Sequence, residues 1–169
     1  MTYQITYFSR DGYCAQMAEA LLAILPPGTV MRPMGTDTPA DADAHLVGFD
    51  LRFSDQGKLP ETVIRFLGKL REKTVFLFAT TPYQPDDVQS GRIQRRAVAA
   101  LPRECDYRGM FLCGAEPSRE LLQGFRHAAE VKPNSDRIRH WLDRCQRAVG
   151  HPDEADRKEL CQFAEHVLK

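Results

Sequence analysis

Residues 3–25, YQITYFSRDGYCAQMAEALLAIL, decide the fold that we expect for this chain. Tyr3 to Phe8 is rich in aromatic and β-branched residues, which predicts a β-strand. From about Tyr13 to Leu25, apolar residues recur at helical spacing, and Pro26-Pro27-Gly28 ends this helix. A strand that leads at once into a helix is the repeating unit of a parallel sheet.

The same alternation continues to the end of the chain. Further strands are expected at about 29–33, 44–49, 73–81 and 108–113, and further helices at about 60–70, from Asp86-Asp87 onward, and at about 118–129, 135–148 and 153–168. Alternating strands and helices predict an α/β fold with one parallel sheet, in a single domain that spans residues 1–169. The loops after the first, third and fourth strands then meet at one carboxyl edge, where ligands bind in such folds.

Charge and composition exclude several classes of protein. The 169 residues hold 23 Lys and Arg against 23 Asp and Glu, so the basic excess of a typical nucleic-acid-binding protein is missing. The charge is uneven, because residues 1–57 carry three bases and seven acids, whereas residues 58–110 carry ten bases and six acids. No apolar run reaches the roughly 20 residues of a membrane span, and no signal-peptide pattern opens the chain. We therefore expect a cytoplasmic protein without a nucleic-acid or membrane partner.

The cysteines and histidines indicate neither a disulfide framework nor a metal site. Five cysteines form no Cys-x-x-Cys pair, and we expect reduced, mostly buried thiols. The histidines of the C-terminal helices show no paired ligand spacing, so no metal is assigned.

The loop between the first strand and the first helix is the candidate anion site. It comprises Ser9, Arg10, Asp11, Gly12, Tyr13 and Cys14. Its backbone N–H groups converge at a helix N-terminus, which favours an anion, although the loop has neither the Walker nor the dinucleotide-binding glycine pattern. The alternative is an ordinary turn with Asp11 or Ser9 as the helix cap.

Several motifs resemble those of flavodoxins. Residues 7–12, followed by Ala18-Glu19-Ala20, resemble the loop that binds the FMN phosphate in that family, and residues 46–49 and 75–80 are similar to the strands before its two flavin-flanking loops. Residues 111–114 and 151–156 resemble a short flavodoxin-like subgroup of anaerobic bacteria. The resemblance implies a three-layer α/β/α sandwich with five parallel strands in the order 2-1-3-4-5. It also implies a bacterial flavoprotein of electron transport that binds FMN and shuttles electrons between redox partner proteins, as a monomer or weak homodimer.

The resemblance also implies which residues touch FMN. Besides residues 9–14, the candidates are Phe49, Asp50, Leu51, Phe53, Asp55 and Gly57 after the third strand, and Thr80, Thr81, Pro82 and Tyr83 after the fourth. Phe53 and Tyr83 are expected to stack on the flavin ring, and a peptide within residues 55–57 is expected to turn its carbonyl toward flavin N5. A carrier of this kind has no catalytic acid or nucleophile of its own.

Departures from the family pattern leave other functions open. Tyr13 and Cys14 replace the usual Asn and Thr, and Asp11 adds a carboxylate that Arg10 or the helix dipole would have to offset, an effect of about 1 kcal/mol. We therefore expect weakened FMN binding, and the alternative is a flavin-free binding or scaffold domain. Lesser alternatives are an FMN-dependent NAD(P)H quinone reductase and a phosphatase-like enzyme that uses the Cys-x5-Arg pattern from Cys113 to Arg119.

The helices near residue 140 have two expected faces. Trp141 and Leu142 are expected to be core anchors. Arg137, Arg139, Arg144 and Arg147 are expected to form a solvated face, with a partner-docking patch as the alternative.

Overall fold

Five parallel strands form the centre of the protein in the computed structural model, which describes all residues 1–169. The strands are β1 (Tyr3–Phe8), β2 (Val30–Pro33), β3 (Ala44–Asp50), β4 (Thr74–Thr81) and β5 (Asp106–Gly114). Their order across the sheet is β2-β1-β3-β4-β5, and every pair is parallel. The predicted fold class and strand order are confirmed.

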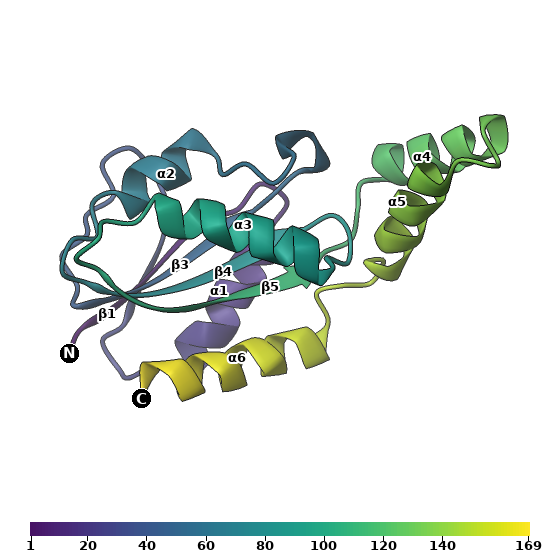
Figure 1. Ribbon diagram of the computed structural model, residues 1–169. Helices are drawn as coiled ribbons and strands as arrows, with labels where there is room; N and C mark the ends of the chain where they lie inside the picture. The colour runs from purple at the N-terminus through teal and green to yellow at the C-terminus, as the bar shows by residue number, and fades with distance from the viewer.

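Helices cover both faces of this sheet (Figure 1). They are α1 (Tyr13–Ile24), α2 (Glu61–Leu67), α3 (Asp87–Ala99), α4 (Arg119–Val131), α5 (Asp136–Arg147) and α6 (Glu154–Leu168), with a 3-10 turn, η1 (Phe53–Asp55). Helices α1 and α6 pack on one face and α2 and α3 on the other, whereas α4 and α5 form a hairpin that stands out beyond the carboxyl ends of the strands. No helix is long and apolar enough to cross a membrane.

Side-chain caps explain where four of the helices begin. Asp86, Ser118, Ser135 and Asp153 each accept a hydrogen bond from a backbone N–H in the first turn of the helix that follows. Such caps satisfy N–H groups that have no partner inside the helix. The predicted helix starts near these residues are confirmed, whereas the short turn η1 was not predicted because its three residues show no periodicity.

Strand β3 is buried along its whole length and separates two apolar cores. All seven of its residues are buried, as its continuous apolar run indicates. Leu46 faces the core under α1 and α6, and Val47 and Phe49 face the core under α2 and α3. The residue after Phe49, Asp50, ends the strand at the carboxyl edge.

Gly48 sets how closely α1 approaches the sheet. A Cβ atom at Gly48 would lie 2.2 Å from the Phe78 ring and 2.6 Å from the Cys14 sulfur. Both neighbours are buried in the same core. Because Cys14 belongs to the first turn of α1, the missing side chain at Gly48 also positions the loop that precedes α1.

We predict that Gly48→Ala destabilises the protein by about 1–3 kcal/mol, because a methyl group there overpacks the core. Urea unfolding measures the change. Gly124→Ala on α4 is the control, because nothing lies within 4 Å of its added Cβ. We expect this second change to leave stability unchanged or to raise it by up to about 1 kcal/mol. Equal stability of Gly48→Ala and the wild type would contradict the packing role of Gly48.

Candidate functional site at the carboxyl edge

The loop from Ser9 to Cys14 crosses the carboxyl edge between β1 and α1. Gly12 is the N-cap of α1 and has a φ of 85°, a left-handed conformation that suits glycine. Gly12 has no side chain to cap the helix, and the Ser9 hydroxyl accepts the Ala15 N–H of the first turn at 3.3 Å, so the expected capping role fits Ser9 and not Asp11. The other N–H groups of the loop must find acceptors elsewhere.

The carboxylate of Asp50 is that acceptor. Because β3 lies next to β1 in the sheet, the last residue of β3 faces the loop that follows β1. Its Oδ2 accepts hydrogen bonds from the Ser9 hydroxyl (2.9 Å) and from the N–H groups of Arg10 (3.0 Å) and Asp11 (3.3 Å). Its Oδ1 accepts from the Cys14 N–H (2.9 Å) and the Thr80 hydroxyl (2.6 Å). Asp50 is only 1% exposed. The loop is thus an anion site that holds an anion of its own chain.

This arrangement does not fit the phosphate of FMN. The Ser9 hydroxyl and three of the loop N–H groups already bind Asp50, which leaves only the N–H groups of Gly12 and Tyr13 for a phosphate. A phosphate beside this carboxylate would be repelled by roughly 4 kcal/mol for each pair of unit charges about 4 Å apart, at an effective dielectric constant of about 20. The residues present therefore oppose phosphate binding in this loop.

Arg10, one of the two groups that could offset the charge of Asp11, pairs with a different carboxylate. Its Nη1 lies 2.7 Å from Oδ2 of Asp55, and the same carboxylate oxygen accepts the N–H of Arg52 at 2.7 Å. Arg10 therefore ties the first loop to η1, and its charge is neutralised there.

The two expected flavin stackers contact each other. The rings of Phe53 and Tyr83 have centroids 6.2 Å apart and planes at 86°. Two side chains can stack on both faces of a flavin only if their rings are parallel and apart. These two rings are perpendicular and in contact, so a flavin ring does not fit between them. The expected carbonyl turn is also restrained, since the Gln56 carbonyl accepts a hydrogen bond from Arg96 Nη1 at 2.8 Å.

The remaining candidate residues divide between the cores and a cleft. Cys14, Phe49 and Leu51 are buried in the cores, and the Thr81 hydroxyl donates to the Tyr83 carbonyl. Asp11, Tyr13 and Pro82 line a cleft of about 830 Å³ at the carboxyl edge. The other residues that line this cleft are Leu51, Arg52, Phe53, Ser54, Glu116, Pro117, Ser118, Glu120 and Leu121.

The electrostatic character of this cleft is acidic. Asp11, Glu116 and Glu120 line it with one cation, Arg52. Burial raises the pKa of Tyr13, and the nearby Glu116, Asp11 and Asp50 raise it further. An anionic ligand is therefore disfavoured in this cleft as well.

Two aromatic side chains of the hairpin reach the carboxyl edge, which we did not predict. Phe125 of α4 and Trp141 of α5 contact the Phe53 ring edge-on, with centroid distances of 5.2 and 5.1 Å. Trp141 is half-buried and lies outside both cores, so its expected role as a core anchor is wrong. Helical periodicity indicates that α4 and α5 are amphipathic, but it does not say which part of the protein their apolar sides cover.

Most of the cysteines lie in the interior of the protein, as expected. All five cysteines are free, and Cys14, Cys113 and Cys145 are buried. Burial raises the pKa of the Cys113 thiol, and the carboxylates of Asp156 and Asp50 raise it further. A phosphatase nucleophile needs a lowered pKa, so the Cys-x5-Arg alternative is not supported.

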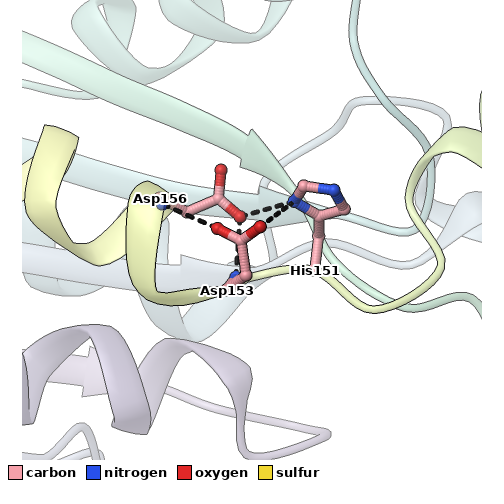
Figure 2. A group of neighbouring side chains, drawn as sticks. All are labelled: His151, Asp153 and Asp156. Carbon is pink, nitrogen blue, oxygen red and sulfur yellow. Dashed lines mark hydrogen bonds and ion pairs between the residues drawn. The ribbon is translucent and has the colours of Figure 1, made fainter.

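One further cluster, His151, Asp153 and Asp156, lies before and within the first turn of α6 (Figure 2). The His151 Nδ1 lies 2.6 Å from Asp156 Oδ2 and 3.7 Å from Asp153 Oδ2. The two aspartates also bond to each other's backbone N–H as the capping box of α6. The start of α6 therefore accounts for the cluster. The hydrogen bond to Asp156 raises the pKa of His151.

Comparisons with known proteins agree with this fold. The family described as a flavodoxin domain matches residues 4–165. The flavodoxin-like domain-containing protein BilS of Clostridium symbiosum is 25% identical, over 96% of this chain and 94% of that protein. BilS of Clostridioides difficile is 21% identical, over 68% of this chain and 65% of that protein.

Solved structures show the same fold at low sequence identity. A flavodoxin of Streptococcus pneumonia TIGR4 superposes with a TM-score of 0.57 at 15% identity, over 99% of this chain and 98% of that one. A short-chain flavodoxin associated with a PDU bacterial microcompartment also has a TM-score of 0.57, at 14% identity, over 99% and 97% of the two chains.

The His151–Asp156 pair predicts a pH-dependent contribution to stability. A folded-state pKa above the unfolded value of about 6.5 stabilises the protein fully below that value, and the contribution is lost as the pH rises through the folded-state pKa. We expect His151→Gln to lower the free energy of unfolding by about 1 kcal/mol or less at about pH 5.5, and to have a smaller effect at about pH 8.5.

Chemical unfolding at both pH values tests this expectation. His127→Gln is the control, because His127 is exposed on α4 and forms no ion pair. An effect of His151→Gln that is the same at both pH values would show that the ionised pair does not contribute.

Proposed function

This chain belongs to the flavodoxin domain family. We propose that it is a flavin-free binding module rather than an electron carrier that holds FMN by its phosphate. Family membership by itself implies a flavin cofactor. The observation that supports a flavin-free module is the Asp50 carboxylate, which takes the hydrogen bonds that this loop would offer to a phosphate.

A carboxylate can replace a bound phosphate here because both are anions that accept several hydrogen bonds. Asp50 satisfies the Cys14 N–H in the first turn of α1 and complements the positive end of that helix. It also fixes the loop to the ends of β3 and β4, since Thr80 donates to the same carboxylate. Four donors of the loop are therefore satisfied without a ligand, whereas the N–H groups of Gly12 and Tyr13 have no acceptor within the chain.

The α4–α5 hairpin supports a protein as the bound partner. Residues 118–148 hold seven Arg and Lys against four Asp and Glu. Four of these bases form no ion pair: Arg119, Arg126, Lys132 and Arg137. Leu121, Leu122 and Phe125 of α4 are only half-buried. A protruding helical pair with a basic surface and partly exposed apolar residues suits a partner protein with an acidic face. The redox proteins that the family resemblance implies are candidates for this partner.

The second candidate function is FMN-dependent electron transfer. The cleft of about 830 Å³ at the carboxyl edge favours it, because this volume lies within the usual range of ligand pockets. For FMN to bind as in the family, the Asp50 side chain would have to leave the loop or lose its charge. The two functions therefore differ in one measurable property, the response of the loop to phosphate.

We predict that Asp50→Ser creates a phosphate site. Without phosphate this variant should be less stable than the wild type by about 2 kcal/mol, because charge-assisted hydrogen bonds are lost. Inorganic phosphate should raise the Tm of Asp50→Ser and leave that of the wild type unchanged. In a fluorescence-quenching titration, Asp50→Ser should bind FMN about 100-fold or more tightly than the wild type, since the charge repulsion is removed.

Asp11→Ser is the matched control. It removes a carboxylate from the same loop but leaves Asp50 on the loop donors, so it should not create a response to phosphate. A wild-type protein that purifies with FMN, or binds it as tightly as Asp50→Ser does, would instead support electron transfer. A folded Asp50→Ser protein with no response to phosphate would show that this loop is not a phosphate site.

A further inference from the structure

A second cavity lies between η1, α3 and α5, and we call it the hairpin pocket. Its volume is about 430 Å³. The pocket shares only Phe53 with the carboxyl-edge cleft and includes no residue of the loop from Ser9 to Cys14. Arg137 and Trp141 of α5 also line it, so the hairpin contributes one side of this pocket.

Three aromatic rings form one wall of the hairpin pocket. Trp141 lies 5.1 Å from both Tyr83 and Phe53, measured between ring centroids, and each pair meets edge to face. These rings offer a flat ligand both apolar area and ring contacts, which add about 1 kcal/mol beyond burial. Burial raises the pKa of Tyr83 to about 12, so its hydroxyl stays protonated as a hydrogen-bond donor.

Two exposed arginines from different helices line the hairpin pocket. Arg92 of α3 and Arg137 of α5 line it, and neither forms an ion pair, although the chain has as many acids as bases. The only acid in the lining, Asp86, accepts the Gln89 N–H at 2.8 Å as the cap of α3 and lies 3.9 Å from Arg144. The pocket therefore holds two free cations and one carboxylate that is already engaged.

We propose that the hairpin pocket binds a flat aromatic anion, with its rings against Trp141 and Tyr83 and its carboxylate or phosphate between Arg92 and Arg137. Guanidinium groups bind such anions through paired, charge-assisted hydrogen bonds. The volume suits two or three fused rings. This site is separate from the loop closed by Asp50 and goes beyond the proposed function, because it gives the module a small-molecule ligand in addition to a partner protein.

The single tryptophan of the chain makes this proposal directly testable. The probe is 2-naphthoate, and 2-naphthamide is its uncharged counterpart of nearly the same shape. We expect 2-naphthoate to shift the one indole N–H signal in an NMR titration, and calorimetry to show about tenfold tighter binding of the acid than of the amide. Equal affinity for the two compounds, or no shift of the Trp141 signal, would overturn the proposal.

Variants distinguish the effect of the two arginine charges on binding from an effect on folding. The double change Arg92→Gln with Arg137→Gln should abolish the preference for the acid, whereas Arg95→Gln with Arg126→Gln removes two exposed charges outside the pocket and should preserve it. Tyr83→Phe keeps the ring and should weaken 2-naphthoate about threefold through loss of the hydroxyl. An unchanged preference in the pocket variant would refute the role of the two arginines.

Asp50→Ser separates this proposal from the proposed function. The residue lies outside the hairpin pocket, so its substitution should leave 2-naphthoate affinity unchanged whether or not it creates a phosphate site. A clear gain in 2-naphthoate affinity in Asp50→Ser would show that the probe binds at the carboxyl-edge loop, and the hairpin pocket would then be rejected.

Discussion

The carboxylate of Asp50 is the interaction on which the carboxyl edge depends. It joins the loop after β1 to the ends of β3 and β4. Buried charges are stable in proteins only when hydrogen bonds replace their lost hydration, and Asp50 receives five. The same five bonds satisfy donors that would be unpaired without an anion. The parallel sheet makes this possible, because it brings the ends of neighbouring strands to one edge.

The α4–α5 hairpin packs against the 3-10 turn η1 on the other side of the carboxyl edge. Phe125 and Trp141 pack against Phe53, so η1 is held between the hairpin and α3. The ion pair of Arg10 with Asp55 holds η1 from the other direction. A loop that binds and releases a cofactor ring needs freedom to move, whereas this one is fixed by aromatic packing and a charge pair. Its surroundings suit a constant binding surface.

Much of the fold could be predicted from the sequence because its signals are local. The apolar run at Ala44–Asp50 and the helical spacing from Tyr13 onward specify elements, and the rules of parallel sheets arrange them. The position of Asp50 at the end of a buried strand could be predicted, but its contacts with residues 36 to 41 positions away have no local signal. The docking of Trp141 was missed for the same reason. It depends on the orientation of the whole hairpin relative to the sheet, and neither periodicity nor composition determines this orientation.

The closed loop also changes how the protein depends on its surroundings. A protein that binds a ligand only when folded gains stability as the concentration of that ligand rises, and loses it when the ligand is scarce. Asp50 is part of the chain, so its effective concentration at the loop is constant. For the flavin-free module proposed above, growth conditions that deplete flavins would therefore leave the folded fraction of the protein unchanged.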